Sequence, residues 1–120
     1  MIFDRPTSSE LLKAVMDFLD TKIKGELPPH LAFKLRITNN VLSMVQREID
    51  QGEQLSEEVI KAMSAIIKSD DLTTKELSNL IKNEDLDLSD EGLKDLLVLL
   101  SKNKIAVDNP NYSTYKKLIK

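Results

Sequence analysis

The chain of 120 residues contains no cysteine and no tryptophan, and it has only three glycines and one histidine. Without cysteine there are no disulfides, thiolate nucleophiles or cysteine-ligated metals, and this absence is typical of a cytoplasmic protein. One imidazole and no thiol leave no ligand set for zinc. Gly25, Gly52 and Gly92 lie too far apart for a glycine-rich phosphate loop. These absences exclude most familiar enzyme classes and cofactors.

Long apolar runs and an excess of positive charge are also missing. The longest apolar run, residues 96–100, is far too short to span a bilayer, and residues 1–10 lack the pattern of a signal peptide. A formal net charge of −3 provides no general attraction to nucleic acid or to anionic membranes. We therefore expect a cytoplasmic protein that has no nucleic-acid partner and no membrane partner.

The residues that are present favour one helical domain. Hydrophobic residues make up 41% and charged residues 31% of the chain, which are values of a globular protein, whereas aromatic residues account for only 4%. This balance favours helix over sheet. The sequence predicts an all-α fold: a compact bundle of five to six helices around a central helix at about residues 29–51, forming a single domain over residues 1–120.

Local signals place the individual helices. Thr7 and Thr73, each followed three residues later by glutamate, form capping boxes, and Ser56, Ser89 and Ser113 are candidate N-caps. Gly25 and Gly52 are candidate C-terminal stops, and the short linker after Gly25 favours an antiparallel pair of helices. The predicted helices cover about residues 7–24, 29–51, 56–68, 73–81, 89–103 and 113–119, and residues 104–112 are predicted to be extended.

The predicted central helix is apolar around most of its circumference, which suggests neighbours on two or three sides. What remains is a narrow polar strip consisting of Arg36, Asn40, Ser43 and Arg47, which lie within about 60° around the helix axis. Two guanidinium groups with an amide between them can hold a carboxylate or a phosphate. The strip can also face water, or it can dock the chain ends, for example by pairing Arg36 with Asp108 or Asp4.

Other candidates for chemistry are weaker. His30 lies beside two prolines at the predicted entry to a helix, which is typical of a solvated turn histidine. Asp85, Asp87 and Ser89 resemble the start of a calcium loop, but Asp90 replaces the required glycine and Leu96 replaces the bidentate glutamate. The sequence therefore predicts no metal site and no cofactor.

A set of motifs at both ends and in the central helix resembles a known family. The motifs are Arg5-Pro6-Thr7, Arg36, Asn39-Asn40, Arg47-Glu48, Asp108-Asn109-Pro110 and Tyr112. They are similar to those of an uncharacterised family of small bacterial helical proteins, a domain of unknown function. Members are encoded beside, or fused to, aminoglycoside-phosphotransferase-like kinases, often near acyl-CoA dehydrogenases. The resemblance spans nearly the whole chain, but its middle third matches only in helical character.

The resemblance implies no catalytic residues, because the family has no assigned activity. Its motif positions suggest that both termini lie against the polar strip, with Asp108 or Glu10 bonding an arginine and Tyr112 covering the arginine stem. The arrangement is either a structural clasp or the floor of a small pocket. The candidate residues are Arg5, Arg36, Asn40, Arg47, Asp108, Asn109 and Tyr112.

Two functions follow as hypotheses. The first is a non-catalytic accessory or interaction module for a separately encoded enzyme, either a phosphotransferase-like kinase or an acyl-CoA dehydrogenase. The second is a binder of a small anionic metabolite, an acyl thioester or a phosphate ester, held by Arg36, Asn40 and Arg47 with Arg5 and Tyr112 closing over it. An enzyme would have to rely on carboxylates alone for acid–base chemistry, so a non-catalytic protein is favoured. The sequence leaves the oligomeric state open.

Overall fold

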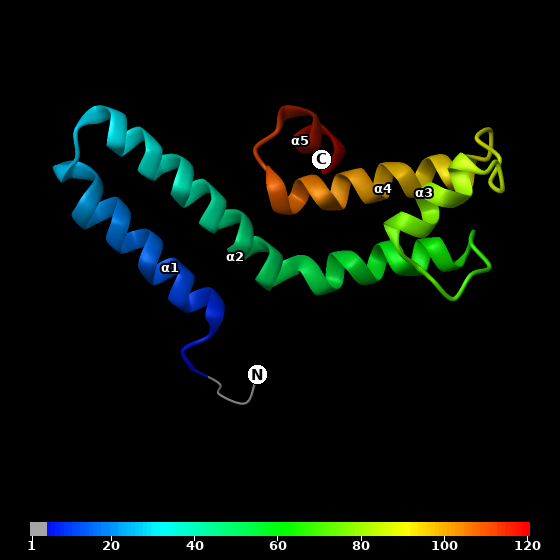
Figure 1. Ribbon diagram of the computed structural model, residues 1–120, viewed down its shortest axis with the longest axis horizontal. Helices are drawn as coiled ribbons and strands as arrows, with labels where there is room; N and C mark the ends of the chain where they lie inside the picture. Colours follow the sequence, from blue (N-terminus) through cyan, green and yellow to red (C-terminus); the bar gives the residue numbers. More distant parts are fainter. Residues whose placement is uncertain (1–4) are drawn as a thin grey trace. The chain divides into compact units, whose positions relative to one another are not determined.

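The computed structural model describes residues 5–120 (Figure 1), so the candidate ion-pair partner Asp4 lies outside the described residues. This part of the chain forms five α-helices and contains no strand, so the predicted all-α class is confirmed. The chain divides into two compact units, unit 1 up to Gly52 and unit 2 from Glu53 to Lys120. The single domain and the bundle around a central helix stay predictions.

Unit 1 is an antiparallel pair of helices (Figure 1). Helix α1, Ser8–Phe18, continues as a π-helical turn η1, Leu19–Ile23, and a 3₁₀ turn η2, Lys24–Glu26, before α2, Pro29–Ser64, returns beside it. Thr7 is confirmed as the N-cap, because its hydroxyl accepts a hydrogen bond from the Glu10 amide at 3.1 Å, whereas the Glu10 carboxylate pairs with Arg5 instead of completing a capping box. The predicted antiparallel pairing of the first two helices is confirmed as well.

Helix α2 corrects two predictions. It runs without a break for 36 residues, through Gly52, which was predicted to end it, and through Ser56, which was predicted to cap a separate helix. No described glycine has a positive φ, so Gly52 is a helical residue rather than a stop. One glycine inside a helix costs only about 1 kcal/mol, and the packing of Val59 and Met63 in unit 2 offsets that cost.

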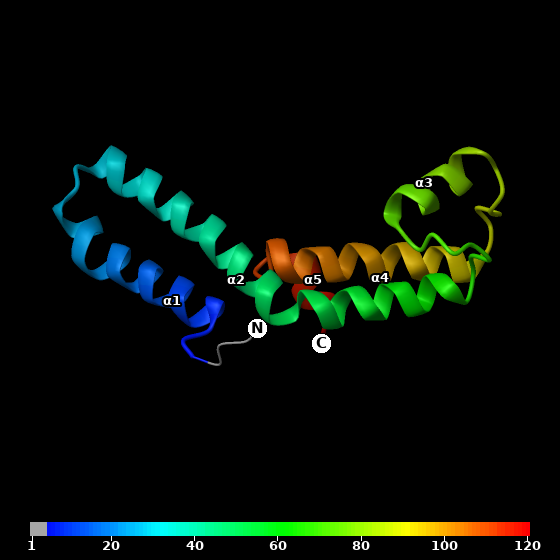
Figure 2. The same ribbon diagram turned by 60° about the horizontal axis from the view of Figure 1, so that its bottom comes forward.

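Unit 2 contains the buried core of the described chain. The C-terminal part of α2 lies beside α4, Glu91–Asp108, and both contact α3, Thr74–Lys82 (Figure 2). The core side chains are Val59, Met63, Ile67, Leu77, Leu93 and Leu96. Thr73 is confirmed as the N-cap of α3, because its hydroxyl accepts a hydrogen bond from the Glu76 amide at 3.2 Å.

The helices at the end of the chain correct three predicted boundaries. Helix α4 begins at Glu91 with Asp90 as its N-cap, because the Asp90 carboxylate accepts from the Gly92 amide at 2.8 Å, while Ser89 bonds Asp87 instead. It does not end at Asn103 but continues to Asp108, so residues 104–108 are helical rather than extended. Helix α5, Ser113–Leu118, has Tyr112 rather than Ser113 at its N-cap.

Within unit 1, the first half of α2 has α1 as its neighbour and is not enclosed on two or three sides. No described residue of unit 1 is fully buried. Leu35, Leu42 and Met44 of α2 are partly buried, whereas its other large apolar side chains in this unit remain 39–54% exposed. Unit 1 is therefore held together by one half-buried seam between two helices. Of the helices described in residues 5–120, none combines the length and the hydropathy that crossing a bilayer requires.

Candidate functional site

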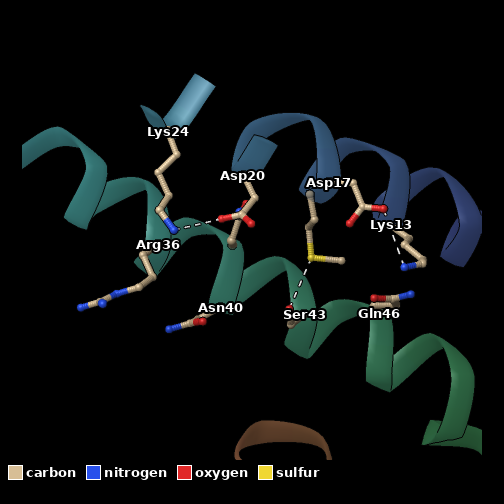
Figure 3. A pocket seen from close by; sticks show the side chains of 10 residues that line it. Lys13, Asp17, Asp20, Lys24, Arg36, Asn40, Ser43 and Gln46 are labelled. Atoms are coloured by element: carbon tan, nitrogen blue, oxygen red, sulfur yellow. Dashed lines mark hydrogen bonds and ion pairs between the residues drawn. The ribbon is translucent and has the colours of Figure 1, made fainter. Parts of the chain in front are cut away.

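A polar groove lies within unit 1, between α1–η1 and α2 (Figure 3). Its volume is about 600 Å³. Its lining residues are Lys13, Met16, Asp17, Asp20, Lys24, Arg36, Asn39, Asn40, Ser43 and Gln46. Helix α1 with its two turns supplies the charged pairs, and α2 supplies the arginine, the amides and the hydroxyl.

The charges of the groove are mostly balanced locally. Lys13 pairs with Asp17 at 3.7 Å, and Lys24 pairs with Asp20 at 3.1 Å, each one helical turn apart (Figure 3). Arg36 forms no ion pair among the described residues, and its guanidinium lies over the ring of Phe33, 5.3 Å from the ring centre. Arg36 is thus the cation of the groove that is not matched by a carboxylate.

Two hydrogen bonds fix the register of α1 and α2 beside the groove. The Ser43 hydroxyl donates to the Met16 sulfur at 3.3 Å (Figure 3). The Gln46 side-chain amide donates to the Ser9 hydroxyl at 3.2 Å. The Asn39 side-chain oxygen is buried but accepts no hydrogen bond within the described chain. A buried acceptor of this kind costs about 1–3 kcal/mol, or it is available to a donor on a ligand.

The structure places only two of the seven predicted site residues in the groove. Arg36 and Asn40 line it and extend from the same side of α2 (Figure 3). Arg47, two turns further along α2 from Asn40, is half-buried and does not line the groove. Arg5 pairs with Glu10 at the start of α1, so a bond between an arginine and Glu10 is present, with Arg5 rather than with the polar strip.

The three predicted residues of the C-terminal end belong to unit 2. Asp108 pairs with Lys104 inside α4 at 3.1 Å, and the Asn109 amide closes α4 by donating to the Ile105 carbonyl. Tyr112 is half exposed at the start of α5. Contact between this end of the chain and the polar strip stays a prediction.

Sequence reasoning missed the contribution of the first helix to the groove. Lys13, Asp17, Asp20 and Lys24 carry mixed charges on the face opposite the apolar stripe of that helix, a pattern that is typical of a solvated face. Their spacing places them on one face of the first helix, but it does not reveal that α2 brings Arg36 and Asn40 beside them. Only the pairing of the two helices brings these residues together.

In the acidic loop before α4, Asp87 is hydrogen-bonded by its neighbour Ser89. The Asp87 carboxylate accepts hydrogen bonds from the Ser89 amide at 2.9 Å and from the Ser89 hydroxyl at 2.7 Å. These bonds, the amide first, lower the pKa of Asp87, because they stabilise its charged form. Across residues 5–120 no group of three or more potential metal-ligating side chains gathers at one place.

Unit 1 also carries a large exposed apolar surface. Leu11, Val15 and Phe18 lie within about 60° on one side of α1, and each remains about half exposed. We call these three residues the α1 flank. Apolar side chains gathered on a monomer surface mark an interaction site more often than isolated ones do.

Of the comparisons with known proteins, one identifies a family. No curated protein and no solved structure matches the chain. One family profile matches residues 25–112, which include the groove residues of α2 and the Asp108-Asn109-Pro110 motif but not the Arg5-Pro6-Thr7 motif. By this match the chain belongs to the family described as a domain of unknown function, DUF6285.

Proposed function

We propose that the protein is a non-catalytic interaction module that binds and stabilises a separately encoded enzyme. The observation that carries this proposal is the lack of a core in unit 1, where no described side chain is fully buried. Two helices joined by a half-buried seam gain little from burial, so a partner that covers their apolar residues supplies stabilisation that the unit itself lacks.

The α1 flank is the proposed docking surface for the enzyme. An amphipathic helix presents apolar anchors to a groove on its partner at a spacing of three and four residues, and Leu11, Val15 and Phe18 have this spacing. The resemblance to proteins encoded beside kinases and acyl-CoA dehydrogenases supports a phosphotransferase-like kinase or an acyl-CoA dehydrogenase as the partner.

Reconstitution from purified proteins tests this proposal. The tagged chain is recovered from its native cells, the enzymes that accompany it are purified separately, and their binding is measured by calorimetry. We expect a kinase or dehydrogenase to bind in a fixed stoichiometry, and the double change Val15→Ser and Phe18→Ser to weaken that binding at least ~10-fold. Val98→Ser, which changes an equally exposed valine of α4, is the matched control and should have no effect.

Two outcomes would contradict the proposal. One is the absence of binding to either class of enzyme at ~100 µM, well above the range of specific complexes. The other is binding that the α1 flank variants leave unchanged while circular dichroism shows their helix content intact.

The groove supports a second candidate function, the binding of a small anionic metabolite. Its specific observation is Arg36, a cation without a carboxylate partner among the described residues, beside the amide of Asn40. A phosphate or carboxylate would accept hydrogen bonds from both side chains, and the adjacent Asn39 oxygen would accept a hydrogen bond from a ligand hydroxyl.

Thermal shift measurements test the groove. Inorganic phosphate, a simple phosphate ester and an acyl-CoA are titrated separately, since a ligand that binds only the folded chain raises its melting temperature. We expect Arg36→Ala to abolish any shift, while Lys34→Ala, which removes a neighbouring exposed cation that does not line the groove, preserves it. The absence of any shift, or the same shift in Arg36→Ala, would rule the anion site out.

A further inference from the structure

Helix α2 carries an exposed row of apolar side chains in unit 1. Its members are four residues apart and are 40–54% exposed: Phe33, Ile37, Val41, Val45 and Ile49. We call this row the α2 ridge. Residues at this spacing form a continuous ridge on a helix, and such ridges are the features that pack into the grooves of a neighbouring helix. We propose that the α2 ridge is a self-complementary surface at which two copies of the chain associate antiparallel, about a two-fold axis at Val41.

The ridge has the symmetry that a two-fold dimer requires. In an antiparallel pair of identical helices, residues equally far from the axis on either side of it oppose each other. Val41 is the middle member of the ridge, so Val41 meets its own copy and Ile37 meets Val45 of the second copy. Apolar side chains therefore oppose apolar side chains at the centre of the contact.

Two charged residues beside the ridge, Lys34 and Glu48, are placed symmetrically about Val41. Lys34 lies seven residues before Val41 and Glu48 lies seven residues after it, and the three residues lie within about 40° around the helix. Both charged side chains are exposed, and no ion pair of the described chain involves either. An antiparallel dimer places each Lys34 near Glu48 of the other copy, whereas a parallel dimer places Lys34 near Lys34. Charge complementarity thus favours the antiparallel orientation.

The exposed area fits a reversible dimer. Successive members of the ridge are rotated by about 40° around α2, so Ile37, Val41 and Val45 face the second copy while Phe33 and Ile49 lie at the margins of the contact. The apolar area that these half-exposed side chains can bury is small for a protein interface, which indicates a weak, concentration-dependent association. This inference goes beyond the proposed function, because it concerns the α2 ridge and not the α1 flank or the groove.

Sedimentation velocity of the full chain at low salt, from ~5 to 500 µM, tests the association. We expect the average mass to rise with concentration from that of one chain towards that of two. Val41→Glu brings two carboxylates together at the axis and should keep the protein monomeric over this range. Val98→Glu, at an equally exposed position of α4, is the matched control and should dimerise like the parent.

Charge reversal tests the orientation. Lys34→Glu and Glu48→Lys each create two like-charged pairs in an antiparallel dimer, and each should weaken self-association roughly 3- to 30-fold at low salt. An equimolar mixture of these two variants restores both attractive pairs, so the mixture should associate as tightly as the parent. Lys61→Glu, which changes the same charge in unit 2, should have no effect.

The proposal is overturned if the parent chain remains monomeric up to the highest concentration, or if Val41→Glu dimerises like the parent. The antiparallel orientation is overturned if the mixture of the charge variants associates no better than either variant alone. If Val41→Glu fails to fold, the measurements on the parent chain and on the charge variants still test the proposal, because the charge variants alter exposed side chains only. Enzyme binding through the α1 flank is measured separately and does not depend on them.

Discussion

The side-chain amide of Asn103 in α4 donates a hydrogen bond to the Glu58 carboxylate of α2 at 3.1 Å. The same nitrogen donates to the Leu55 carbonyl at 3.0 Å. Asn103 is the buried polar residue of the described chain, with 6% of its surface exposed. A buried amide that is satisfied by two acceptors of one helix fixes the position of α4 along α2 within unit 2.

Replacing Asn103 tests this linkage. Asn103→Ala removes both hydrogen bonds and leaves a small cavity in a buried site, so the free energy of unfolding should fall by about 1–3 kcal/mol in urea denaturation. Asn79→Ala, an exposed asparagine of α3, serves as the control and should change it by less than ~0.5 kcal/mol. Equal stability of Asn103→Ala and the parent would show that these bonds do not hold α4 in place.

The helical glycines Gly52 of α2 and Gly92 of α4 are expected to respond differently to replacement by alanine. A Cβ at Gly52 would meet the Glu48 Cγ at 3.4 Å, an ordinary contact, so Gly52→Ala should stabilise the protein by about 0.5–1 kcal/mol. A Cβ at Gly92 would lie 3.2 Å from the Asp90 carboxylate oxygen that caps α4, so Gly92→Ala should gain less or destabilise the cap. Melting temperatures of the two variants provide the comparison. A loss of stability in Gly52→Ala would mean that α2 is broken at this position.

The protein should be less stable with Asn39 than with an apolar residue at this position. Its side-chain oxygen is buried without a hydrogen bond in the described chain, so Asn39→Leu should raise the free energy of unfolding by about 1 kcal/mol. Asn40→Leu, at an exposed position on the same helix, is the control and should change stability by less than ~0.5 kcal/mol. If the groove binds an anionic ligand, Asn39→Leu should also reduce the thermal shift that the ligand causes. Destabilisation by Asn39→Leu would contradict this account.

The pKa of Asp87 should rise only part of the way to its ordinary value in Ser89→Ala. This change removes the hydroxyl bond but leaves the amide bond, which is the larger cause of the lowered pKa. Because the folded pKa is lowered, any stabilisation by these bonds is present above the unfolded pKa and is lost as pH falls through the folded pKa. Carboxyl NMR titration measures the shift, with Ser101→Ala as the control. A pKa that Ser89→Ala leaves unchanged would exclude a role for the hydroxyl.

The sequence by itself determined the helical class and those helix ends whose chemistry is local. Thr7 and Thr73 cap their helices because each hydroxyl needs only an amide three residues away. Asn109 ends α4 because Pro110 excludes helical backbone at the residue before it. These outcomes depend on neighbours in the chain, so they can be predicted without knowing the fold.

The tertiary structure decided what depends on residues far apart in the chain. Gly52 stays helical because Val59 and Met63, further along α2, are buried in unit 2. Asn103 lies inside α4 because its side chain is itself buried there. In both cases tertiary packing outweighs the tendency of the residue to end a helix. The groove exists because α2 returns beside α1, η1 and η2 and brings Arg36 next to the Lys13–Asp17 and Asp20–Lys24 pairs. The periodicity of one helix reveals which of its residues share a face, but only its packing reveals which face is left uncovered. Similar apolar faces are therefore buried in the core of unit 2 but remain half exposed on the two helices of unit 1.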